Sequence, residues 1–237
     1  MPKAEPKADR DVDRLYRSLR DKHGSGDSKA NGYVTHGYFL REQEILFGLL
    51  NHAAHNLMDL GCGSGLMCKP LIDKRELIIG VDFNEDACAD AQRNGLQAIR
   101  GDAFELPISD DAVEEIVCCQ FFNQQTNDAV AKLIEESARV LRPGGRLVMI
   151  WRNGDAYIHR AALFLARMAG IFSDSPQFPY ENHSLASVVT CGRTNGMVAE
   201  LEAVSFPPFK WVSKNVDGLL SKWVGASSIC ILRKPST

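Results

Sequence analysis

The sequence predicts an α/β protein with a doubly wound parallel sheet that helices cover on both faces. Short apolar runs of strand length alternate with segments of helical length through the middle of the chain, an alternation that is typical of parallel sheets. The apolar runs contain few charged residues, as expected of strands that are buried on both faces. A glycine-rich turn follows the first of these runs, where such a sheet binds its ligand.

Five apolar runs are expected to form the parallel strands: 56–60, 77–81, 96–99, 115–121 and 146–151. The segments of helical length between them are 64–74, 84–94 and 127–141. Asn127 or Asp128 can cap the last helix, and Pro143-Gly144-Gly145 ends it. Pro70 predicts that the first of the three helices is short or kinked.

The two ends of the chain depart from this alternation. Residues 1–11 are Pro, Lys, Ala and Asp in the main, a composition that predicts a disordered tail. A short helix is expected at 12–20, and another leads into the first strand. In the C-terminal third we expect helices at 156–169 and 184–195, with a proline-containing loop at 173–183 between them.

Composition and charge narrow the classes of function. The net charge of −3 argues against non-specific nucleic-acid binding, which depends on a basic field. No apolar run is long enough to span a membrane, and the charged N-terminus does not resemble a signal sequence, so a cytoplasmic location is expected. The seven cysteines include no CxxC pair, which favours reduced, buried thiols over disulfides or a metal site.

The glycine-rich turn lies in the stretch LMDLGCGSGL, residues 57–66. Glycine permits positive φ and lets the backbone approach a ligand closely, and the N–H groups that follow can bind it. An ordinary tight turn needs one glycine, whereas this one has Gly61, Gly63 and Gly65. The three glycines therefore predict a binding turn.

Two kinds of ligand fit such a turn. A nicotinamide or flavin dinucleotide requires G-x-G-x-x-G, and the third glycine position is occupied here by Leu66. Asp59 lies two residues before the first glycine, where a carboxylate would repel a pyrophosphate but attract an ammonium group. A ligand with an amino-acid end is therefore favoured, and an NAD(P)-dependent oxidoreductase is the alternative. A serine hydrolase is excluded because Ser64 lacks the flanking glycines of a G-x-S-x-G turn.

Three further segments extend the pattern: IIGVDFNED, GDAFELPISDDAVEEIV and RVLRPGGRLVMIW. Together with the glycine turn, and in this order and spacing over residues 55–152, the chain resembles the class I S-adenosylmethionine-dependent methyltransferases. The second segment is similar to the small-molecule enzymes of ubiquinone and menaquinone biosynthesis. The resemblance implies S-adenosylmethionine as the cofactor.

The resemblance also implies the strand order and the domain organisation. We expect a seven-stranded, mostly parallel Rossmann-like methyltransferase sheet whose last strand, near 228–233, is antiparallel between its neighbours. Residues 12–237 would form one domain: a helical cap at 12–54, a cofactor-binding core at 55–152, and acceptor-side helices with the last two strands at 153–237. The linker at 207–226 is longer than usual and has room for a small helix near 216–224; it would cover the acceptor or form a subunit contact.

The cofactor-binding residues follow from the matched motifs. Asp82, 21 positions after Gly61, could accept both ribose hydroxyls. Asp102 could accept from the adenine amino group, and the Ala103 N–H could reach a ring nitrogen. Phe83 and Phe104 would line the adenine pocket or belong to the core. The predicted cofactor-binding set is Asp59, Gly61, Cys62, Gly63, Gly65, Asp82, Phe83, Asp102, Ala103 and Gln120.

The acceptor is the least defined part of the prediction. Methyl transfer from a sulfonium requires mainly that the reactants be held in line, so no catalytic acid or base is assigned. The segment CCQFFNQQTND after the fourth strand lacks the motifs of adenine, glutamine or cytosine methylation, and also the histidine of many relatives. We therefore expect a small-molecule O, N or C nucleophile rather than nucleic acid.

A non-catalytic S-adenosylmethionine-binding or partner-binding module is a second alternative. The candidate acceptor-pocket residues, each of which could instead be core or rim, are Tyr33, His36, Tyr38, Phe121, Phe122 and Trp151.

Overall fold

The computed structural model describes residues 7–33, 35–121, 123, 125–153, 161, 165, 168, 183–206, 211–214 and 227–236. Most of the expected helix at 156–169 and of the expected loop at 173–183 lies outside these residues, as does the expected small helix near 216–224.

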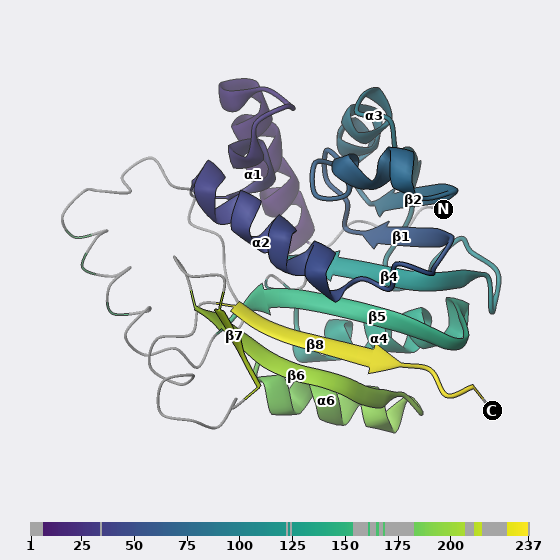
Figure 1. Ribbon diagram of the computed structural model, residues 1–237. Helices are drawn as coiled ribbons and strands as arrows, with labels where there is room; N and C mark the ends of the chain where they lie inside the picture. Colours follow the sequence, from purple (N-terminus) through teal and green to yellow (C-terminus); the bar gives the residue numbers. More distant parts are fainter. Residues whose placement is uncertain are drawn as a thin grey trace.

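One eight-stranded sheet forms the centre of the molecule, in the order β3-β2-β1-β4-β5-β8-β6-β7 (Figure 1). The strands are β1 Asn56–Leu60, β2 Leu77–Asp82, β3 Gln97–Arg100, β4 Val113–Cys119, β5 Leu141–Arg152, β6 Val198–Phe206, β7 Trp211–Ser213 and β8 Ser227–Arg233. The first five strands are mutually parallel, and β8 is antiparallel to both β5 and β6. The expected seven-stranded mixed sheet is therefore confirmed. A short eighth strand, β7, which the sequence did not predict, pairs with the outer edge of β6.

The helices lie on both faces of the sheet (Figure 1). They are α1 Lys7–His23, α2 His36–Leu49, α3 Glu85–Arg93, α4 Asn127–Val140 and α6 Leu185–Thr194, with 3₁₀ helices η1 Ser28–Asn31 and η2 Lys69–Lys74. One apolar cluster joins α4 and α6 to the sheet, and a second joins α2, α3 and η2 to the opposite face. Strand side chains alternate between the two clusters: Met58 and Leu60 belong to the first and Leu57 to the second.

Three local predictions need correction. The segment at 64–74 contains a short helix, as Pro70 predicted, but it is the 3₁₀ helix η2 rather than an α-helix, and Pro70 stands at its beginning. Thr126, not Asn127 or Asp128, caps α4, because its side chain accepts a hydrogen bond from the Ala129 N–H at 3.3 Å. That helix ends at Val140, and β5 begins at the next residue, before Pro143.

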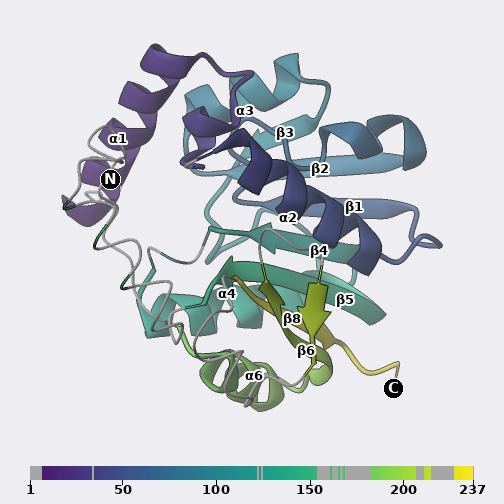
Figure 2. The same ribbon diagram turned by 60° about the vertical axis from the view of Figure 1, so that its left-hand side comes forward.

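The N-terminal helix begins earlier than predicted. Helix α1 starts at Lys7, inside the segment expected to be disordered, and it stands apart from the sheet on the left-hand side of Figure 2. Among the described residues, no helix combines the length and the apolar character that crossing a membrane requires.

Candidate active site

A cavity lies at the carboxyl ends of the parallel strands. Nine of the ten residues predicted to bind the cofactor line it: Asp59, Gly61, Cys62, Gly63, Asp82, Phe83, Asp102, Ala103 and Gln120. They come together because parallel strands end at the same edge of the sheet, and the residues lie at or just after the carboxyl ends of β1, β2, β3 and β4.

The glycine turn has the backbone conformation that the sequence predicted. Gly61, Gly63 and Gly65 all have positive φ, at 72°, 52° and 75°, a region that favours glycine. A Cβ atom at Gly61 would lie 2.4 Å from the Phe121 ring. Gly65 does not line the cavity; a Cβ there would lie 3.1 Å from Ala91 and Leu96, so its role is packing.

Asp59 is a buried carboxylate without a cationic partner in the described part of the chain. It is 2% exposed, and its Oδ2 atom has no hydrogen-bond partner there. Burial raises its pKa to about 7, and the Cys68 thiol donates the hydrogen bond that partly offsets this rise. Burying an unpaired carboxylate is costly, so the geometry suits a ligand that brings a positive charge, such as the ammonium of an amino acid.

Asp82 is held at the end of β2 by two backbone donors. The Gly63 N–H donates to Oδ2 at 2.8 Å and the Asn84 N–H donates to Oδ1 at 2.9 Å. The carboxylate is therefore fixed beside the glycine turn. A carboxylate fixed in this way can accept hydrogen bonds from the hydroxyl groups of a ligand.

Aromatic, apolar and polar groups line the cavity together at the ends of β2 and β3. Phe83 is 43% exposed at its mouth, where the Arg100 guanidinium lies 5.4 Å from the ring centroid. The Phe104 N–H donates to Asp102 Oδ1 at 2.9 Å, and Ala103 is buried. An aromatic wall beside a carboxylate and backbone N–H groups suits a planar heterocycle with donors and acceptors on its edge.

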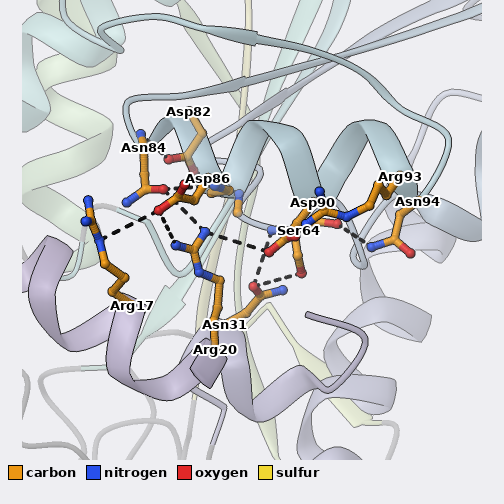
Figure 3. A network of polar contacts seen from close by, with 12 residues as sticks. Arg17, Arg20, Asn31, Ser64, Asp82, Asn84, Asp86, Asp90, Arg93 and Asn94 are labelled. Carbon is orange, nitrogen blue, oxygen red and sulfur yellow. Dashed lines mark hydrogen bonds and ion pairs between the residues drawn. The ribbon is translucent and has the colours of Figure 1, made fainter. Parts of the chain in front are cut away.

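The N-terminal elements close the cavity through polar contacts that the sequence did not predict (Figure 3). Arg20 of α1 donates to Asn84 Oδ1 at 3.3 Å and pairs with Asp86 at 3.0 Å. Asn31 Oδ1 accepts from the Ser64 N–H and hydroxyl at 3.3 and 3.0 Å. Arg20 and Asn31 both line the cavity. Neither belongs to a recognisable motif, so no signal in the sequence pointed to them.

A second buried carboxylate, Glu42 of α2, was also missed. It is 2% exposed, and burial raises its pKa. The Tyr33 hydroxyl donates to its Oε2 atom at 3.0 Å, while Gln120 Nε2 and the Ser227 hydroxyl donate to its Oε1 atom at 2.6 and 2.7 Å. Tyr33 and Gln120 also line the cavity, so Glu42 lies directly behind its wall.

The candidate acceptor residues divide into three groups. Tyr33 and Phe121 line the cavity, whereas Phe122 lies outside the described residues. Tyr38 does not line the cavity but exchanges a 2.7 Å hydrogen bond with the Ser227 hydroxyl. His36 is exposed at the start of α2, where its Nδ1 atom lies 3.2 Å from the Ser28 hydroxyl.

Trp151 was wrongly placed at the acceptor pocket. Its side chain is fully buried in the apolar cluster beneath α4 and α6. The indole N–H donates to the His183 carbonyl at 2.9 Å, which satisfies its only polar group. Trp151 is therefore a core residue.

Two solved methyltransferase structures have a similar fold. A geranyl diphosphate C-methyltransferase from Streptomyces coelicolor, crystallised with S-adenosylhomocysteine, superposes with a TM-score of 0.66 at 15% identity, covering 98% of this chain and 100% of the other. A magnesium protoporphyrin IX methyltransferase from Synechocystis, also with bound S-adenosylhomocysteine, gives a TM-score of 0.60 at 16% identity, covering 93% of each chain. At these identities the likeness shows the fold, which this chain shares with both methyltransferases.

Sequence comparison identifies the domain. Residues 58–149 match the family described as "Methyltransferase domain". An uncharacterized methyltransferase of Mycobacterium tuberculosis is 34% identical over 115 residues, 47% of this chain and 46% of the relative. A demethylmenaquinone methyltransferase of Beutenbergia cavernae is 31% identical over 130 residues, 51% of this chain and 53% of the relative. The chain spans about half the length of the curated relatives it matches.

Proposed function

We propose that the protein transfers the methyl group of S-adenosylmethionine to a small-molecule O, N or C nucleophile. The observation that carries this proposal is the row of three carboxylates, Asp59, Asp82 and Asp102, around one cavity. Asp59 lies in β1, Asp82 ends β2 and Asp102 follows β3, and these three strands are neighbours in the sheet. Their order suits the ammonium, the ribose and the adenine of one extended molecule.

Each residue has a binding or positioning role in this proposal. Asp59 pairs with the ammonium, Asp82 accepts the ribose hydroxyls, and Asp102 with the Ala103 N–H holds the adenine edge. The bound sulfonium supplies an activated methyl group with a good leaving group. The chain has to hold the nucleophile in line and keep water out, and Arg20 and Asn31 contribute by closing the cavity.

The surroundings of the cavity support a small molecule, rather than nucleic acid, as the acceptor. Tyr16, Asn31 and Tyr33 line it from the N-terminal side, so the strand ends are covered rather than open. A covered cavity admits a small molecule more readily than a nucleic-acid strand. The net charge of −3 points the same way. Because the similar folds above act on geranyl diphosphate and on a magnesium porphyrin, fold alone does not choose the acceptor.

The first experiment is a calorimetric titration of the purified protein with S-adenosylmethionine, S-adenosylhomocysteine and NAD. We expect micromolar affinity for the first two and none for NAD. Asp82→Asn should abolish this binding, whereas Asp73→Asn, an exposed acid in η2, should leave it unchanged. Binding of NAD alone would instead support an oxidoreductase.

Methyl transfer is tested separately with S-adenosylmethionine labelled in its methyl group. Phenols, primary amines and reduced quinones represent the three kinds of nucleophile. Label in one of these products would support the proposal. Tight cofactor binding with no transfer to any acceptor class would support the non-catalytic module instead.

A further inference from the structure

We propose that Glu42 makes the site selective for the positively charged form of the cofactor. Its buried carboxylate, held against the end of β4 by Gln120, stabilises a sulfonium relative to the neutral thioether that remains after methyl transfer. This inference rests on the proposed function, and it assigns to α2 a role that no motif of the sequence indicates.

The first argument is the character of the groups around Glu42. Its hydrogen-bond partners are the hydroxyls of Tyr33, Tyr38 and Ser227 and the amide of Gln120. All four are neutral donors. Within the part of the chain that the structure describes, no lysine, arginine or histidine forms an ion pair with Glu42. Neutral donors stabilise a carboxylate through their dipoles, but they leave its net negative charge in place.

The second argument is the position of this charge. Gln120 lines the cavity and has a left-handed backbone conformation, with φ at 59°. Its backbone N–H donates to the Ile150 carbonyl at 2.8 Å, and its side chain bonds to Glu42. A non-glycine residue in this conformation is strained and is kept only where its surroundings require it. The next residue, Phe121, packs on Gly61. The end of β4 therefore stands over the glycine turn.

The cofactor's sulfur belongs at this place. If Asp59 holds the amino-acid end and Asp82 the ribose, the sulfur that joins them lies between the two, beside the glycine turn. Gln120 is then the cavity wall next to the sulfur, and Glu42 stands directly behind it, 2.6 Å from the Gln120 amide nitrogen. Inside a protein, charges act on one another much more strongly than in water. A carboxylate one side chain behind the cavity wall should therefore attract a cation in the cavity.

The consequence concerns selection of cofactor over product. Methyl transfer removes the positive charge from sulfur, so the attraction is lost as the reaction proceeds. An interaction that weakens toward the transition state does not accelerate the chemical step. Glu42 is therefore a positioning residue that favours binding of the methylated cofactor and release of the demethylated product.

The experiment compares three ligands that share the same amino-acid, ribose and adenine groups. S-adenosylmethionine carries a charged sulfonium, sinefungin carries a protonated amine at the same place, and S-adenosylhomocysteine is neutral there. Wild-type protein and Glu42→Gln are titrated with each by calorimetry. We expect the variant to lose about tenfold in affinity for the two charged ligands, or about 1.4 kcal/mol, and less than twofold for S-adenosylhomocysteine. Glu44→Gln, an exposed acid on the same helix, is the matched control and should change none of the three.

Each other result overturns a distinct claim. Equal losses for all three ligands would show that Glu42 only supports the wall, and no loss would show that its charge does not reach the cavity. Failure of wild-type protein to bind any of the three would refute the proposed function instead. If Glu42→Gln melts far below wild type, the variant cannot be used, and the affinities of wild-type protein are compared instead. Both charged ligands must then bind more tightly than S-adenosylhomocysteine, and equal affinities would overturn the inference.

Discussion

The two ends of the sheet treat buried acids in opposite ways. At the amino end of β4, Glu115 is fully buried, and Arg75 and Arg146 pair with its two oxygens at 3.5 and 3.3 Å. At the carboxyl end, Asp59 and Glu42 are as deeply buried but have no cationic partner among the described residues. Burial raises the pKa of all three acids, but two arginines partly offset the rise at Glu115, whereas no described cation pairs with Asp59 or Glu42.

The largest expected effect comes from breaking the compensated end. Glu115→Gln would leave Arg75 and Arg146 without their shared anion. Removing one partner of a buried ion pair typically costs about 3–5 kcal/mol, so we expect a loss of this order in the free energy of unfolding, measured by urea denaturation. The backbone N–H of Asn51, which also donates to Glu115, would keep an acceptor in the amide. Cofactor affinity of the folded fraction should stay within twofold, and a larger change would mean that the two ends of the sheet are coupled.

Removing the buried acid at the carboxyl end of the sheet should instead raise the free energy of unfolding. Folding raises the pKa of Asp59 from 3.8 to about 7, so the ionised side chain destabilises the ligand-free fold progressively as pH rises from about 4 to 7. Asp59→Asn should therefore stabilise the ligand-free protein at pH 8, by about 2 kcal/mol. The same change removes the partner of the ammonium and should weaken cofactor binding about a hundredfold. Thermal melting and calorimetry measure the two effects, and a destabilised variant would contradict the assignment.

The pH dependence of cofactor affinity sharpens this point. Asp59 must lose its proton before it can pair with an ammonium, and its pKa is about 7. Affinity should therefore fall as pH falls through 7, by about twentyfold between pH 7.5 and 5.5. Asp59→Asn is the control, because its remaining affinity should not change over this range. A wild-type profile as flat as that of the variant would place the ammonium elsewhere.

The sequence predicted the strand-end side of the cavity but not the side formed by the N-terminal elements. Each strand and the acid at its end lie within one short stretch, as with Met58, Asp59 and Gly61. A local pattern therefore contains both the element and its ligand group. Nine of the cavity-lining residues were accessible for this reason, whereas the sheet order was implied by the resemblance to a known family.

The other wall of the cavity could not be predicted because its contacts join distant parts of the chain. Glu42 and Ser227 are 185 positions apart, and Arg20 and Asp86 are 66 apart. Trp151 was misplaced for a related reason. Its position at the end of β5 suggested the site, but the alternation of the strand directs its side chain into the core under α6.

The smallest expected effect concerns the closure of the cavity by α1. Arg20 is 11% exposed, but Asp86, its nearer ionic partner, is 58% exposed, so solvent and salt screen this pair and it contributes less than about 1 kcal/mol. Arg20 also lies 3.7 Å from the buried Asp90, which would keep its ion pair with Arg93. Arg20→Gln should therefore raise the dissociation rate of the cofactor only a few-fold, with little change in the melting temperature. Stopped-flow displacement of the bound cofactor at low and high salt tests this. The wild-type dissociation rate should rise toward that of the variant at high salt, because ion pairs hold α1 over the site. Backbone hydrogen bonds, which salt screens less, hold Asp82 and Asp102 at the strand ends. A salt-independent difference would mean that Arg20 contacts the cofactor directly.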